Sequence, residues 1–199
     1  RMAAARLEAS LRDRPGDSLA FKISQSIRFL LGDAAGLRAG AGMAAGGIGP
    51  DHPHHGYLLG ATAFGLEETG DYAGAEAAGR AGLEISPDDV WGLHAVAHVM
   101  DMTGRADDGV RWLAGRSSHW AHCNNFGYHV WWHLALFHID RGAFGPALEL
   151  YDRQVRPSPT EDWRDIANAA SLLMRLEIEG VAIGDRWEEL ADISSRRVD

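Results

Sequence analysis

Two pairs of histidines could do chemistry, because the members of each pair are spaced i, i+4. The first pair is His94 and His98, and the second is His129 and His133. On a helix this spacing places both imidazoles of a pair on one face, with their Cβ atoms about 6 Å apart. An imidazole can bind a metal, transfer a proton or hydrogen-bond a buried neighbour. The chemistry therefore depends on the helices that carry the pairs.

Those helices belong to a repeat of helical hairpins. Helical periodicity recurs along the chain, and no stretch alternates apolar and polar residues over six or more positions. Glycines recur at steps of about 34 to 38 residues, close to the period of the tetratricopeptide repeat (TPR). They are Gly32, Gly70, Gly104, Gly142 and Gly180. Each is predicted to end the first helix of a hairpin, called helix A below.

The clearest copies carry more than a glycine. Gly70-Asp-Tyr-Ala-Gly-Ala75 and Gly142-Ala-Phe-Gly-Pro-Ala147 share an aromatic anchor and a small residue that allows close helix approach. Weaker terminal copies pair residues 19–31 with 34–45, and residues 165–179 with 186–195, as is usual at the ends of such arrays. Residues 46–55, 117–128 and 156–161 are predicted loops. We expect an all-α fold, a right-handed α-solenoid of about five TPR-like hairpins, forming one domain over residues 1–199 with its clearest repeats at 54–156.

The repeat register predicts which side chains face a ligand. A helices line the concave groove of a TPR array, and neighbouring helices lie about 9–10 Å apart. The two histidine pairs are therefore expected on adjacent A helices, facing one groove. The predicted groove residues are Tyr57, Phe64, Glu67, Glu68, Trp91, His94, His98, Asp101, His129, Trp132, His133 and Asp140.

A polar stripe marks the last A helix. Asn168, Ser171 and Arg175 are spaced i, i+3, i+7 on an otherwise apolar segment. Buried polar groups need partners, and Arg175 suits a carboxylate. We expect a salt bridge within the chain in preference to a carboxylate of the ligand.

Three interpretations of the four histidines stay open. Two His-xxx-His pairs with nearby acids suit a transition-metal site at His94, His98, His129 and His133. A polar pocket that binds a small molecule or transfers protons is the second, and buried histidines bonded to neighbouring groups are the third. Ala95 and Val130 follow the first histidine of each pair, so the His-Glu-xx-His signature of metalloproteases is absent.

Composition narrows the protein class. The net charge of −9 argues against nucleic-acid binding, and no apolar run is long enough for a membrane span. Cys123 is the only cysteine, which excludes a disulfide within the chain and fits a cytoplasmic protein. A shortened solenoid would expose apolar end faces, so self-association is expected.

Several motifs resemble the tetratricopeptide repeat protein 38 family. They are the runs from His94 to Arg105, from Trp131 to His138 and from Ala147 to Asp152, with shorter matches at 63–70, 170–176 and 184–187. The resemblance covers residues 51–191 and implies an all-α protein about twice this length, so the chain would be a fragment or a shortened member. The family usually has Glu at the position of Asp101 and Asn at that of Val130. It implies no settled activity.

These observations lead to a functional expectation. We expect a TPR-type binding protein whose groove holds a small molecule or peptide. Its ligand-binding residues would be His94, His98, Asp101, His129, Trp132, His133, Glu67, Glu68, Trp91 and Arg175. The alternative is an enzyme, metal-dependent, oxidative or hydrolytic, that uses the same groove.

Overall fold

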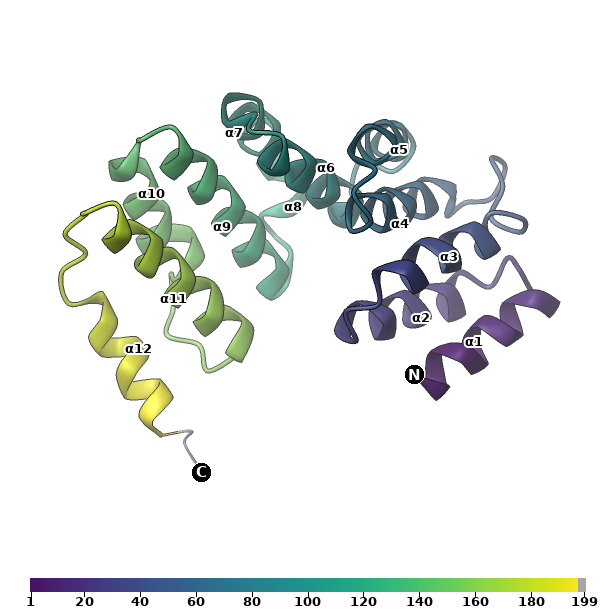
Figure 1. Ribbon diagram of the computed structural model, residues 1–199, viewed down its shortest axis with the longest axis horizontal. Coiled ribbons are helices and arrows are strands. Elements are labelled where there is room, and N and C mark those ends of the chain that lie inside the picture. Colours follow the sequence, from purple (N-terminus) through teal and green to yellow (C-terminus); the bar gives the residue numbers. More distant parts are fainter. Residues whose placement is uncertain (197–199) are drawn as a thin grey trace. The chain divides into compact units, whose positions relative to one another are not determined.

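The computed structural model describes residues 1–196, and every regular element in that range is helical (Figure 1). The helices form two compact units, which divide between Thr103 and Gly104. Unit 1 contains α1 (Met2–Asp13), α2 (Ser18–Leu30), α3 (Ala34–Ala44), α4 (His55–Glu67), α5 (Tyr72–Ile85) and α6 (Val90–Met102). Unit 2 contains α7 (Ala106–Ala114), α8 (Ser117–Trp120), α9 (Asn124–Asp140), α10 (Phe144–Leu150), the π-helical turn η1 (Tyr151–Val155), α11 (Trp163–Ile178) and α12 (Arg186–Ser195).

The all-α prediction is confirmed, and the fold is an α-solenoid of TPR-like hairpins. Helices α2, α4, α6, α9 and α11 are the A helices. Within the units, α2 packs on α3, α4 on α5, α9 on α10 and α11 on α12. The prediction of a single domain over the whole chain stays a prediction.

The repeat glycines turn the chain as their spacing predicts. In the described part of the chain, positive φ occurs only at glycines, and five of these six are the repeat glycines. At Gly70, with φ of +82°, the glycine N–H donates to the Glu67 carbonyl at 2.9 Å, and the Asp71 N–H donates to the Leu66 carbonyl at 2.9 Å. The same pair of bonds closes the turns at Gly32, Gly142 and Gly180. This is the Schellman motif, whose left-handed position favours glycine.

Aspartates start the helices that follow two of these turns. Asp33 comes directly after Gly32 and accepts a hydrogen bond from the Gly36 N–H at 2.9 Å. Asp71 makes the equivalent bond to the Gly74 N–H at 3.1 Å. A side-chain oxygen at this position satisfies an N–H that has no partner inside the helix. A Gly-Asp dipeptide thus ends one helix and begins the next.

The packing of unit 1 includes a close approach between the backbones of α4 and α6. Gly60 on α4 faces Gly92 on α6, and the carboxyl group of Asp89, the N-cap of α6, lies beside both. A Cβ atom at Gly60 would lie 1.7 Å from Asp89 Oδ2 and 3.0 Å from Gly92 Cα. The two glycines therefore set the spacing of the A helices that carry His98 and its acidic neighbours.

In unit 2, a buried polar network joins the N-terminal ends of α9 and α11. Asp165 on α11 is 1% exposed, and its Oδ2 accepts from Asn125 Nδ2 at 2.9 Å and from Thr160 Oγ1 at 2.6 Å. Arg156 donates to Thr160 and pairs with Glu189 on α12 at 2.6 Å. These bonds link the segment between η1 and α11 to α11 and α12 directly, and to α9 through Asp165.

Two segments differ from the sequence-based expectation. Helix α1 was not expected. Residues 117–128, predicted as a loop, form the short helix α8 and the first turn of α9, which begins at Asn124. The start of α9 is helical because its polar side chains have partners: Asn125 bonds to Asp165, and the Asn124 Oδ1 accepts from the Phe126 N–H. No helix within residues 1–196 is long and apolar enough to cross a membrane.

Candidate functional site

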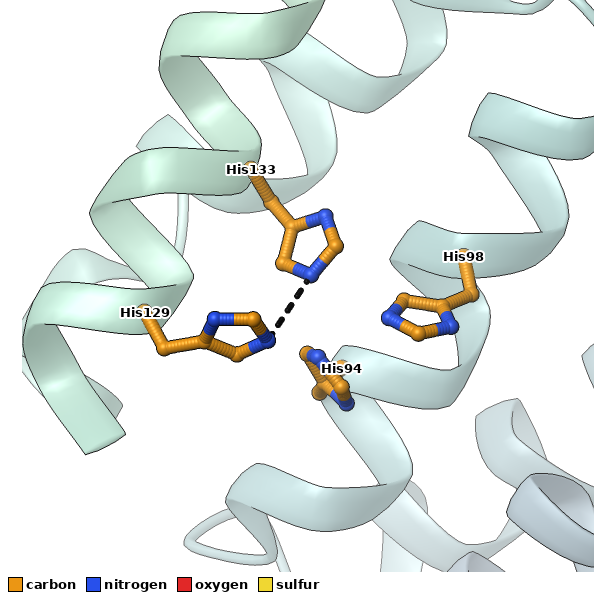
Figure 2. Close-up of side chains that lie close together, drawn as sticks. All are labelled: His94, His98, His129 and His133. Atoms are coloured by element: carbon orange, nitrogen blue, oxygen red, sulfur yellow. Dashed lines mark hydrogen bonds between the residues drawn. The ribbon is translucent and has the colours of Figure 1, made fainter. Parts of the chain in front are cut away.

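The first histidine pair lies on α6 with an acid behind it. The rings of His94 and His98 have centroids 4.2 Å apart, as the i, i+4 spacing predicts, and Figure 2 shows both rings on the same side of α6. His98 Nδ1 lies 3.2 Å from Oε2 of Glu67 on α4. Because Glu67 is buried, this contact holds the His98 ring in one orientation from inside unit 1.

Glu68 adds a second carboxylate on the same side of α4. Glu67, Glu68 and His98 each offer a ligand atom, and these atoms lie within 4.8 Å of one another. Loss of hydration on partial burial, and then the charge of Glu67, raise the pKa of Glu68 above its usual range. The predicted acidic neighbours of His98 are therefore in contact distance within unit 1.

Trp91 lies at the other side of the same A helices. Its ring packs edge-on against Phe64 and Phe29, with centroids 5.2 and 5.5 Å away, and Lys22 Nζ stands 4.5 Å from its centroid. These side chains line a small cavity of about 30 Å³ between α2, α4 and α6. That volume admits about one water molecule, so Trp91 and Phe64 act here mainly as packing between helices.

The second histidine pair lies on α9. His129 Nε2 and His133 Nε2 are 3.2 Å apart, the contact drawn as a dashed line in Figure 2. His129 Nδ1 lies 3.1 Å from Oδ1 of Asn168 on α11, and the His129 ring stacks on Trp132 with an interplanar angle of 13°. His129 is thus fixed by an amide on one edge and an indole on one face.

Arg175 extends this surface along α11. Its Nη1 donates to the carbonyl and hydroxyl oxygens of Ser171, and its Cζ lies 5.5 Å from the centroid of the Trp132 ring. The predicted salt bridge within the chain is not found: Arg175 has no carboxylate partner among the described residues. The guanidinium is held instead by Ser171 of the same helix and by the Trp132 ring of α9.

The polar stripe on α11 contacts side chains of α9. Asn168 faces His129, and Ser171 with Arg175 faces the Trp132 side of the same helix. The spacing of Asn168, Ser171 and Arg175 predicts the polar stripe, but it does not predict that Asn168 bonds to a histidine. The signal that could have found it is the matching position of these polar residues on consecutive A helices.

Three other predicted groove residues lie near the ends of their helices. Asp101 is half-buried near the end of α6, Asp140 is exposed at the end of α9, and the Tyr57 hydroxyl donates to Asp88 at 2.8 Å. The predicted convergence of the two histidine pairs on one groove stays a prediction from the repeat register.

Comparison with known proteins supports the fold assignment. No protein-family model matches the sequence. The structure is similar to the crystal structure of a kinesin light chain-like protein of Podosopora anserina that has nearly identical TPR-like repeats. The TM-score is 0.64 at 15% identity, and the match covers 96% of this chain and 98% of that one. At this identity the likeness shows the fold alone, so the chain has the fold of a TPR-like helical repeat protein.

Proposed function

We propose that this chain is a TPR-type binding protein that holds a carboxylate-bearing peptide or small molecule on its A helices. The observation that carries the proposal is Arg175, a half-buried cation on an A helix with no acidic partner in the described part of the chain. TPR-like repeats generally mediate protein interactions, which makes a peptide carboxylate a suitable ligand group.

The surroundings of Arg175 favour an anion. A guanidinium has five N–H donors in a planar fork that matches a carboxylate, and Ser171 accepts only from Nη1. Trp132 supports one face of the guanidinium at cation–π distance. A guanidinium group that is already held by stacking loses little side-chain entropy when it binds a ligand. The donors on Nε and Nη2 are the ones we assign to the ligand.

Trp132 supports the proposal with a second donor. Its indole Nε1–H is buried and makes no hydrogen bond to the protein. A buried donor without an acceptor costs roughly 1–3 kcal/mol. A ligand oxygen that reaches this N–H while the ligand pairs with Arg175 would recover that energy.

The proposed assignment to the tetratricopeptide repeat protein 38 family rests on the motifs quoted above. We also propose a cytoplasmic location and self-association. An enzyme that uses the same surface is the alternative, and the observation that favours it is the 3.2 Å spacing of the Nε2 atoms of His129 and His133.

A peptide titration tests the carboxylate proposal. The probe is a tetraglycine peptide with a free C-terminal carboxylate, and its C-terminal amide is the matched probe without the charge. We expect the indole N–H resonance of Trp132 and the Nε–H resonance of Arg175 to shift with the acid and not with the amide in ¹H–¹⁵N NMR spectra. Arg175→Met should weaken binding by about 10-fold or more, the value of a charge-assisted hydrogen bond.

Arg153→Met is the matched control, because Arg153 is an exposed arginine of the same unit that pairs with Glu149 one turn away. It should bind the acid as the parent protein does. Equal binding of the acid and the amide, or equal binding by the Arg175→Met and parent proteins, would contradict the proposal.

A further inference from the structure

We propose that the histidine pairs of α6 and α9 are transition-metal ligands, each pair binding through Nε2 with a side chain of the neighbouring A helix orienting one ring. The inference does not depend on the carboxylate proposal, since it concerns different atoms. It rests on the spacing of the ligand nitrogens in α9 and on the partners of His98 and His129.

The two Nε2 atoms of α9 stand at the spacing that a metal requires. Zinc binds imidazole nitrogen at about 2.0–2.1 Å, so two nitrogens of one ion with bond angles of 90° to 110° lie about 2.9–3.4 Å apart. His129 Nε2 and His133 Nε2 are 3.2 Å apart. The distance between the two ligand atoms therefore already suits one ion, and the rings need only turn so that both Nε2 lone pairs point at it.

Asn168 sets the protonation of His129. The Oδ1 of Asn168 can only accept, so His129 Nδ1 carries the proton and Nε2 carries the lone pair. Without a metal, His133 Nε2–H donates to that lone pair. When a metal ion binds, the proton of His133 moves from Nε2 to Nδ1 by exchange with water, so both rings stay neutral and both Nε2 atoms carry a lone pair for the ion. Histidines that bind metals usually donate the other ring N–H to a neighbouring acceptor in this way.

In the pair on α6, as in the pair on α9, one ring bonds through Nδ1 to a side chain of another A helix. His98 Nδ1 lies 3.2 Å from the carboxylate of Glu67, and His94 follows His98 at a ring-centroid distance of 4.2 Å. A carboxylate behind the ring fixes the ring orientation and leaves Nε2 available to an ion. In both units, the orienting side chain comes from the A helix that packs beside the pair.

The donor set selects the class of ion. Imidazole nitrogen suits Zn²⁺, Co²⁺, Ni²⁺ and Cu²⁺, whereas Mg²⁺ and Ca²⁺ prefer oxygen ligands. We therefore expect binding of late first-row divalent ions. Glu67 and Glu68 lie close enough to His98 to supply an oxygen ligand or to balance the charge of the ion.

A Co²⁺ titration followed by visible absorption tests the inference, with Zn²⁺ as competitor. We expect the parent protein to bind Co²⁺ and to release it to Zn²⁺ but not to Mg²⁺ or Ca²⁺. His129→Gln with His133→Gln should remove the binding contributed by α9. Asn168→Ala keeps every ligand and should weaken Co²⁺ binding about 10- to 100-fold, and Glu67→Gln should do the same for α6.

His119→Ala with His122→Ala is the matched control, because both are exposed histidines of the same unit outside the pairs. It should bind Co²⁺ as the parent does. The inference is wrong if the parent protein binds neither Co²⁺ nor Zn²⁺, or if the His129→Gln, His133→Gln protein and the control bind Co²⁺ equally. If that double variant does not fold by circular dichroism, the folded Asn168→Ala protein decides. Carboxylate binding measured without metal tests the other proposal separately.

Discussion

The protonation of Asp89 affects the stability of unit 1. Its carboxyl group caps α6 by accepting from the Gly92 N–H at 3.2 Å, and it is only 6% exposed. Burial raises the pKa of Asp89 to about 7, although the charge of Lys22 and the backbone hydrogen bonds act in the opposite direction. An aspartate in an unfolded chain has a pKa of about 3.9. Between these values the folded protein binds a proton that the unfolded chain has released.

The sign of the resulting pH dependence follows from this difference. Because the folded state binds more protons, the free energy of unfolding contributed by Asp89 should fall by roughly 1–3 kcal/mol between pH 5 and pH 8. Asp89→Asn keeps a capping side chain and should remove this slope. Urea unfolding of both proteins at pH 5, 6.5 and 8 measures it. Parallel pH profiles for the two proteins would show that Asp89 does not titrate as described.

The histidine spacing was predictable from the sequence, but the ring partners were not. An i, i+4 pair shares a helix face whatever surrounds it. The partner of His98 is 31 residues away and that of His129 is 39 residues away, each on another A helix. Arg175 shows most clearly which contacts could not be predicted from the sequence. Its charge favours an acidic partner, yet the structure stacks it on Trp132, which only the packing of α9 on α11 determines.

At the scale of helices, α4 and α6 can approach closely because glycines replace side chains at their contact. The glycine at position 60 leaves room for the Asp89 carboxyl group, and Gly92 lets the backbone of α6 come within reach of α4. The A helices of unit 1 are therefore spaced by backbone contact. His98 and Glu67 meet at 3.2 Å on these same two helices.

Gly60→Ala tests this close approach. The added methyl group would collide with the Asp89 carboxyl group, and overpacking of this kind costs about 1–3 kcal/mol. We expect the free energy of unfolding in urea to fall by that amount. Gly42→Ala is the control, since a Cβ atom there meets nothing within 4 Å and alanine favours a helix by about 1 kcal/mol. Equal effects of the two substitutions would contradict the account.

Most helices were predictable because their ends carry local signals. The Schellman glycines and the aspartates that follow them act within six residues, so the repeat register located α2 to α7 and α9 to α12 without tertiary information. Residues 117–128 were predicted as a loop because their Ser, His and Asn content suggests one. Contacts to Asp165, 40 residues away in sequence, stabilise the start of α9 instead.

At the scale of the whole molecule, the chain has a TPR-like fold, and unit 1 exposes apolar side chains on its first A helix. Leu19, Ile23 and Leu30 are 69%, 42% and 74% exposed and lie on one face of α2. Exposed apolar patches favour contact with another protein surface. This stripe supports the expectation that the chain self-associates.

Sedimentation equilibrium tests this expectation by measuring the mass of the protein in solution. We expect the parent protein to sediment as a species larger than one chain, and Leu19→Glu with Leu30→Glu to shift the mass toward the monomer. Ile178→Glu is the control, because Ile178 is an equally exposed apolar residue on α11. A parent protein that is monomeric at every concentration tested, or a mass lowered equally by the control, would contradict this use of the α2 surface.

Binding of a metal ion by side chains of the A helices can be seen in an anomalous difference map of crystals grown with Co²⁺. We expect a peak about 2.0–2.2 Å from the Nε2 atoms of His129 and His133, with Asn168 still bonded to His129 Nδ1. The same map shows whether His94 and His98 bind an ion of their own. Co²⁺ bound only at exposed loop histidines, or at none, would show that the histidine pairs are not metal ligands.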